Sequence, residues 1–414
     1  MLFIIVNGKL FPMKGFFSKE IKLLFLVVAL ALSLRLFLAF NFEATGDMSG
    51  WIRGGKTGLE NKDYGYGKII YNKNCIGCPN WPPLSYHSLI LARWSYLNLN
   101  PFNLPQWGFY KFISVLADTG IILVLYSLAK HLKLKNPLMI ASVYAFHPIA
   151  LEIASYHGQK DSIWLFFGLL TVFFLQKKQT IFAALMMGLG ISFKLPLIFL
   201  FPLFFFSLPK LKEKITFTII FLLASFLLNL PEIYYYFNEV IKQNFFYKGW
   251  FGWWGLSGII SKIGLLMNNP SLLKTFDPFN RAIFYLSVFF SSIYFVKKKI
   301  PLVNACLGVL MIIYVFIPSF ASQYLIWPLP FLILLKDSYP RYFKFYTIYG
   351  TFFAMNFYGV FGISFLEKIF LTIPRENIYY KIPGLIYPMD LGFPLWIFSI
   401  YFLKKIINEK TSKK

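Results

Sequence analysis

A five-residue polar stretch between two apolar segments holds the densest group of side chains that could do chemistry. It reads His157, Gly158, Gln159, Lys160 and Asp161. A carboxylate and an amide can hydrogen-bond the hydroxyls of a sugar or of a phosphate group. Asp161 could also cap the helix that follows it, but a cap does not account for Gln159. The stretch therefore predicts that His157, Gln159 and Asp161 position a sugar or its acceptor.

Asp47 follows the first apolar segment by only a few residues, within the stretch Thr45–Ser49. An ionisable group held at the bilayer is costly unless it is used. A carboxylate fixed at the exit of a helix is well placed to take a proton from a hydroxyl at the membrane surface, as a general base. The alternative is an ordinary solvated loop acid. We predict that Asp47 is the catalytic residue.

Two cations lie near the predicted external interface: Arg35, in the last turns of the first apolar segment, and Lys194, just before Pro196. Either could simply extend its charged end to the interface. Alternatively, Arg35 could bind a phosphate through two parallel hydrogen bonds, and Lys194 could stabilise the same charge. We predict that both contact a substrate phosphate.

Two proline-containing stretches lie at the same predicted level. Trp81–Leu84 closes the longest connection, and its tandem prolines stiffen the backbone. The alternative for this stretch is a stiff interfacial corner anchored by Trp81. The second stretch, Gln323–Pro330, opens a later apolar segment with its polar residues first. We predict that Trp81, Gln323 and Tyr324 bind substrate.

The elements that must position these residues are membrane-spanning helices. Hydrophobic residues make up 57% of the 414 residues, charged residues 14%, and the mean hydropathy is +0.60. A soluble globular chain is nearer ~25% charged. The apolar blocks Leu23–Phe40, Phe112–Leu128 and Ile215–Leu230 each approach the ~20 residues that cross ~30 Å of hydrocarbon. The composition predicts an all-α, polytopic transmembrane protein.

The formal net charge of +24 does not indicate nucleic-acid binding, because the cations are not gathered on one soluble module. They form short clusters on alternate connections, and short loops rich in Lys and Arg stay cytoplasmic. The clusters fall within residues 9–22, 130–135, 177–178, 210–214, 297–299, 336–344 and 404–414. A single topology places all of them, and both termini, on the cytoplasmic face of a cell membrane. The candidate site residues then share the external face.

Counting apolar segments between these clusters gives about 12 spans. Their approximate bounds are 22–40, 108–129, 137–155, 162–176, 180–194, 196–208, 215–231, 281–296, 300–318, 323–336, 342–363 and 392–405. We predict a cytoplasmic N-terminus at 1–21 and a transmembrane catalytic module at 22–363, which includes a large first external loop at 41–107. Residues 364–414 would supply an external loop, the last span and a basic cytoplasmic tail.

The three cysteines carry little information about function. Cys75 and Cys78 fall in the predicted first external loop, where a disulfide between them is plausible. A zinc site is a weaker alternative, since one Cys-x-x-Cys pair supplies two of the four ligands that zinc needs. Cys306 lies in an apolar block and is expected to be a packing residue.

The joint order of these features resembles the multi-spanning C-type glycosyltransferases that use polyprenyl-phosphate sugars, especially the prokaryotic integral-membrane mannosyltransferase-like group. The resemblance covers roughly residues 20–340 and rests on five features in sequence order. They are the acid Asp47 after the first helix, Trp-Pro-Pro-Leu at 81–84, Gly-Gln-x-Asp-Ser at 158–162, Lys-x-Pro at 194–196, and Gln-Tyr-Leu-x-Trp-Pro-x-Pro at 323–330.

The resemblance implies that Asp47 is the catalytic carboxylate and that the donor is a polyprenyl-phosphate sugar carrying mannose or another hexose. The acceptor would be a lipid-linked glycan, a polysaccharide or a protein. Some relatives carry a second acid beside the first, or a late His-x-Arg-Tyr, whereas this chain has Gln323 and Tyr324 instead. No cofactor is therefore certain, and a divalent metal is possible. A lipid-linked sugar flippase or transporter and a polysaccharide polymerase or ligase are the alternative functions.

Overall fold

The computed structural model is helical apart from one N-terminal hairpin, in the part of the chain that it describes. The described residues are 3–6, 9–12, 18–44, 46–60, 81–245, 252, 254–269, 271–361 and 388–408. The hairpin pairs β1 (Phe3–Val6) antiparallel with β2 (Lys9–Pro12), within the predicted N-terminal tail. The predicted pair Cys75 and Cys78 lies outside the described residues.

Three described helices are long and apolar enough to cross a membrane: α1 (Lys19–Asn41), α5 (Gln106–His131) and α14 (Ser271–Lys297). The count rises to five if each of two bent pairs forms one span. A membrane protein is therefore supported, whereas the full set of predicted spans stays a prediction.

Both bent pairs join an apolar helix to a segment that turns away from it. The first pair runs from α6 (Pro137–Ala145) through α7 (Pro148–Ala150) into the π-helix η1 (Leu151–Tyr156), with a bend of 46°. In the second pair, α11 (Leu211–Leu228) meets the first part of α12 (Leu230–Phe245), Leu230–Asn238, at 80°. Neither bend was predicted from the sequence.

Most other helices are shorter, and each of the remaining predicted spans overlaps at least one of them. They are α8 (Asp161–Gln176), α9 (Thr180–Phe193), η2 (Leu195–Leu200), α10 (Phe201–Ser207), α13 (Gly255–Leu266), α15 (Leu302–Phe316), η3 (Ser322–Ile326), α16 (Leu329–Leu334), α17 (Pro340–Phe361) and α19 (Pro388–Ile407).

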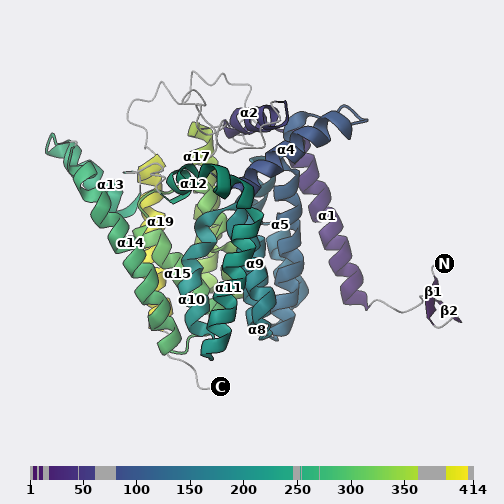
Figure 1. Ribbon diagram of the computed structural model, residues 1–414. Coiled ribbons are helices and arrows are strands. Elements are labelled where there is room, and N and C mark those ends of the chain that lie inside the picture. Colours follow the sequence, from purple (N-terminus) through teal and green to yellow (C-terminus); the bar gives the residue numbers. More distant parts are fainter. Residues whose placement is uncertain are drawn as a thin grey trace.

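The long axes of α5, α8, α9, α11 and α15 run side by side, and α2 (Asp47–Glu60), α4 (Pro83–Asn98) and α12 lie across one end of this bundle (Figure 1). In its described residues, the predicted first external loop, 41–107, therefore contains the helices α2 and α4. Large apolar side chains such as Phe25 on α1, Leu222 on α11 and Phe290 on α14 point outward and are exposed. Such a surface suits contact with lipid.

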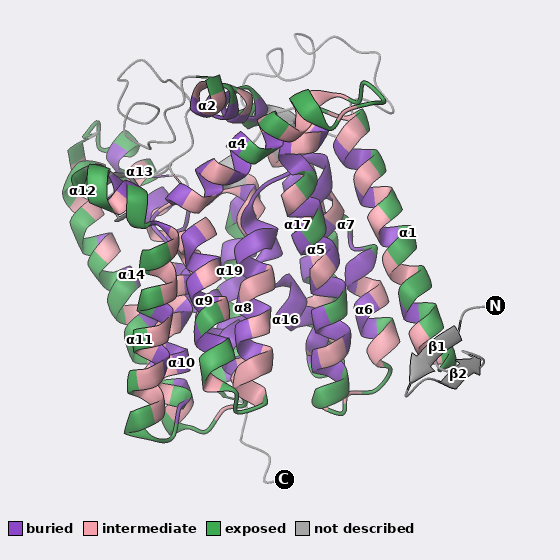
Figure 2. Ribbon diagram, turned by 45° about the vertical axis from the view of Figure 1, so that its right-hand side comes forward, coloured by how far each residue is buried: buried purple, intermediate pink, exposed green. Residues whose placement is uncertain are grey.

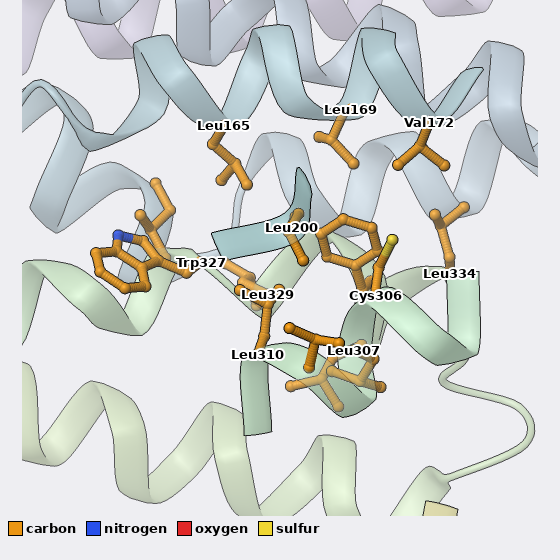
Figure 3. Close-up of a cluster of buried hydrophobic side chains, with 14 of the residues drawn as sticks. Leu165, Leu169, Val172, Leu200, Cys306, Leu307, Leu310, Trp327, Leu329 and Leu334 are labelled. Atoms are coloured by element: carbon orange, nitrogen blue, oxygen red, sulfur yellow. The ribbon is translucent and has the colours of Figure 1, made fainter. Parts of the chain in front are cut away.

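The interior of the bundle is packed with apolar side chains, and buried positions gather on the inward faces of the helices (Figure 2). Figure 3 shows part of this core, where Leu165 and Leu169 of α8 lie across from Leu307 and Leu310 of α15. Cys306 is fully buried there as a free thiol, as expected of a packing residue. This rigid core carries the polar turn that precedes α8.

Candidate active site

Asp47 and Gln159 meet although 112 residues separate them in the sequence. Asp47 is the first residue of α2, and its carboxylate accepts a hydrogen bond of 2.9 Å from Nε2 of Gln159. Asp47 is exposed, while Gln159 is buried with 3% of its surface exposed. The amide therefore orients a carboxylate that a substrate can still reach.

Asp161, the first residue of α8, occupies a different environment. Its carboxylate is fully buried, forms an ion pair of 2.6 Å with Nζ of Lys194, and accepts a hydrogen bond of 2.7 Å from Nε1 of Trp327. The indole of Trp164 donates a longer bond of 3.4 Å to the same oxygen as Trp327. Three donors thus hold Asp161 away from solvent, and Asp47 is the accessible carboxylate of the two.

The turn that carries Gln159 has a specific local geometry. Gly158 takes a left-handed backbone conformation, with φ of +72°, two residues after the π-helix η1 ends at Tyr156. Such π-helical turns are rare and often lie at functional sites. The buried ammonium of Lys111 donates hydrogen bonds to the carbonyls of Tyr156 and Phe42. Lys111 therefore joins the end of η1 to the segment that leads into α2.

Replacing Gly158 with Ala is expected to destabilise the protein. A Cβ atom there would lie 2.2 Å from Cγ of Lys111, and the positive φ disfavours any side chain. The left-handed backbone alone costs about 1–2 kcal/mol, and the clash adds to it. Thermal unfolding in detergent should show a lower midpoint for Gly158→Ala than for Gly54→Ala on α2, where the added Cβ would lie no closer than 3.3 Å to another side chain, at Cδ1 of Leu89. Equal midpoints would contradict the tight turn.

His157 lies inside the protein, and the charge of Asp47 acts on its imidazole. It is fully buried, and its Nε2 lies 3.3 Å from Oε1 of Glu152 on η1. Burial lowers the pKa of His157, against a smaller opposing effect of Glu152. This geometry supports a role in forming the turn, and sugar contact by His157 stays a prediction.

Lys160 is also buried, with 1% of its surface exposed. Its ammonium donates a hydrogen bond to the carbonyl of Tyr110 on α5 and lies 5.1 Å from the centre of the Trp51 ring on α2. Burial lowers its pKa to about 7. Lys194 is the better candidate for contact with a phosphate, because its side chain keeps 13% of its surface exposed.

The Trp-Pro-Pro-Leu stretch begins α4 beside the same group of residues. Trp81 is half-buried, with its ring centre 5.6 Å from that of Trp51. The hydroxyl of Ser85 donates to the carbonyl of Phe193, the residue before Lys194. The side chain of Asn229, at the end of α11, accepts a hydrogen bond of 3.3 Å from the amide of Leu84. These bonds fix the start of α4 against α9 and α11.

Tyr324 is connected to the site by the contact of its ring with that of Trp327. Their rings stack with centres 4.1 Å apart, and Trp327 in turn holds Asp161. The hydroxyls of Tyr314 and Tyr346 donate to backbone carbonyls of η3 and so fix this short helix. Gln323 lies half-buried on η3. Its contact with substrate, like that of Tyr324, stays a prediction.

Arg35 has a different environment from the one expected at an external interface. It is fully buried and forms an ion pair of 2.7 Å with the fully buried Asp118 of α5. Its NH1 donates a bond of 2.7 Å to the carbonyl of Ala145, where α6 ends before the bend, and Tyr144 donates to Asp118. This network joins α1, α5 and α6. Phosphate contact by Arg35 stays a prediction.

Residues 154–251 match the Mannosyltransferase (PIG-M) family model. A comparison with curated proteins finds no match. The matched segment, about a quarter of the chain, contains the turn before α8 and Lys194 but neither Asp47 nor Trp327. It supports a membrane glycosyltransferase of the mannosyltransferase type.

Several residues of the site were not singled out from the sequence. Trp51 carried no recognisable signal, since it lies in a glycine-rich stretch far from the turn in sequence. Trp327 lay inside a stretch that was recognised, but nothing marked it as the partner of Asp161. Asp118 did carry a signal, because an acid within an apolar span calls for a partner such as Arg35. Among the described residues, no group of three or more His, Cys, Asp or Glu side chains could hold a metal ion.

Proposed function

We propose that the protein transfers a sugar, mannose or another hexose, from a polyprenyl-phosphate donor to a lipid-linked glycan, polysaccharide or protein acceptor at the external face of a cell membrane. The observation that carries the proposal is the pairing of the exposed carboxylate of Asp47 with Gln159. Gln159 belongs to the segment that matches the mannosyltransferase family model. An accessible base is thereby joined to the turn that the family match contains.

In the proposed reaction, Asp47 accepts the proton of the acceptor hydroxyl while the hydroxyl oxygen forms a bond to the anomeric carbon of the donor. The bond between that carbon and the phosphate oxygen breaks, and its electrons leave with the polyprenyl phosphate. A general base of this kind contributes about 10²–10⁴-fold to a rate. A single displacement inverts the configuration at the anomeric carbon, as in inverting glycosidases.

Lys194 is the proposed cation for the leaving phosphate. Its ammonium has three N–H donors, of which Asp161 takes one at 2.6 Å, and its side chain is partly exposed. The ion pair with Asp161 fixes the direction of the amine before the substrate arrives. Charge placed in advance where negative charge develops is an effective form of catalysis.

The donor class can be tested with purified protein in lipid vesicles and a panel of radiolabelled donors. We expect transfer from a short-chain polyprenyl-phosphate hexose and none from the matching nucleotide sugar. Transfer from the nucleotide sugar alone would contradict the proposed donor. Movement of the intact lipid-linked sugar across the bilayer without cleavage would indicate a flippase.

A further inference from the structure

Two consecutive residues of the turn hold one face of α2. Gln159 bonds to Asp47 at 2.9 Å, and the ammonium of Lys160 lies 5.1 Å from the ring centre of Trp51. Asp47 and Trp51 are four residues apart, so their side chains lie on the same face of the helix, one turn apart. Contacts at two points along one face fix both the position of a helix and its rotation about its axis.

A third contact completes the attachment of α2. The ammonium of Lys160 also donates to the carbonyl of Tyr110 on α5, and the hydroxyl of Tyr110 donates a bond of 3.4 Å to the carbonyl of Ile52 on α2. Gly55 permits this approach, since a Cβ atom there would lie 2.5 Å from the Tyr110 hydroxyl. The turn, α5 and α2 are thus connected pairwise.

Packing alone does not explain a lysine at position 160, because burying its charged amine costs free energy. Lys160 and Trp51 each have 1% of their surface exposed. In the part of the chain that the structure describes, no carboxylate forms an ion pair with Lys160. Burying a charge without an opposite charge is costly, and an uncharged side chain of similar length would fill the same space. The amine adds two favourable interactions, its hydrogen bond to the carbonyl of Tyr110 and its attraction to the face of the Trp51 ring. The second of them acts on α2.

We propose that Lys160 is a positioning residue that acts through Trp51 to hold Asp47 in line with the acceptor hydroxyl. As a statement about catalysis, this rests on the function proposed above. Displacing a reacting group by ~1 Å can cost about 10²-fold in rate. The contact between Lys160 and Trp51 therefore influences turnover without touching the donor.

The test uses Lys160→Met and Trp51→Phe in the full-length protein. Trp254→Phe is the matched control, because Trp254 is a buried tryptophan with 3% exposure whose indole bonds to the carbonyl of Tyr314, outside the site. Hydrogen exchange reports on α2 directly, whether or not the protein is active. We expect amides of residues 47–60 to exchange about tenfold faster in Lys160→Met, and to be unchanged in Trp254→Phe.

Steady-state kinetics separate positioning from a general loss of structure. Lys160→Met should lower kcat by about 10–100-fold and leave the KM of the donor unchanged. In an Asp47→Asn background, the same replacement should have no further effect on residual transfer. A raised donor KM would mean that Lys160 touches the donor, and would overturn the proposal.

The exchange and kinetic results also distinguish failure of this inference from failure of the proposed function. Unchanged exchange in α2 of Lys160→Met would refute the positioning role, even if the wild-type protein transfers sugar. If Lys160→Met shows faster exchange in α2 but the wild-type protein transfers no sugar, the positioning role of Lys160 stands and the glycosyltransferase reaction is refuted.

Discussion

Asp47→Asn is expected to reduce sugar transfer to a small residual rate while leaving the protein folded. The amide keeps the shape of the side chain but cannot accept the proton of the acceptor hydroxyl. Loss of a general base lowers a rate by about 10²–10⁴-fold. Because Asp47 is exposed and sits at the very start of α2, its replacement removes no buried charge. The thermal unfolding midpoint in detergent should therefore stay close to that of the wild type.

Glu43→Gln provides the matched control for this variant. Glu43 is also an exposed acid, four residues before Asp47 on the same connection from α1. It should retain wild-type turnover. If Asp47→Asn also retained it, Asp47 would be an ordinary loop acid, and Asp161 would become the next candidate for the base.

Asp161→Asn is expected to lose sugar transfer for a different reason, namely loss of stability. The replacement leaves Lys194 without its opposite charge in a largely buried position, while Trp327 can still donate to the remaining oxygen. Breaking one partner of a buried ion pair costs about 3–5 kcal/mol. The unfolding midpoint should fall well below that of Asp47→Asn. Activity should be lost together with the folded protein.

A second replacement tests whether the unpaired charge of Lys194 causes the loss of stability. Combining Asp161→Asn with Lys194→Met removes both charges, and most of the lost stability should return. Transfer should not return, because the proposed cation for the leaving phosphate is also gone. A stable single variant that binds donor and acceptor but does not transfer would instead assign the base to Asp161.

Helices in apolar segments were accessible to prediction from the sequence because hydrophobicity alone defines them. The span predicted at 162–176 corresponds to α8, which begins one residue earlier at Asp161. The helix α2 was not predicted, since Gly50, Gly54 and Gly55 lower its helix propensity. Gly54 and Gly55 let α4 and α5 approach closely, and this packing stabilises a helix that the local sequence disfavours.

The residue types of the site could be predicted, but their partners could not. An exposed acid after the first span and a polar turn before α8 are visible in the sequence. Their contact depends on how α2 folds back over the bundle, and no local pattern encodes that. For Arg35, too, the sequence revealed the side chain but not its partner. Its charge was recognised, but pairing with Asp118 across 83 residues directs it into the core.

The most direct test of the account is a stoichiometric measurement on the wild-type protein and Asp47→Asn in lipid vesicles. Both are supplied with an α- or β-linked short-chain polyprenyl-phosphate hexose and an acceptor, and the released polyprenyl phosphate and the new glycosidic bond are quantified together. For the wild type we predict one lipid phosphate per bond formed and an inverted anomeric configuration, with both products strongly reduced in Asp47→Asn. Retained configuration, uncleaved donor, or equal yields from the two proteins would contradict it.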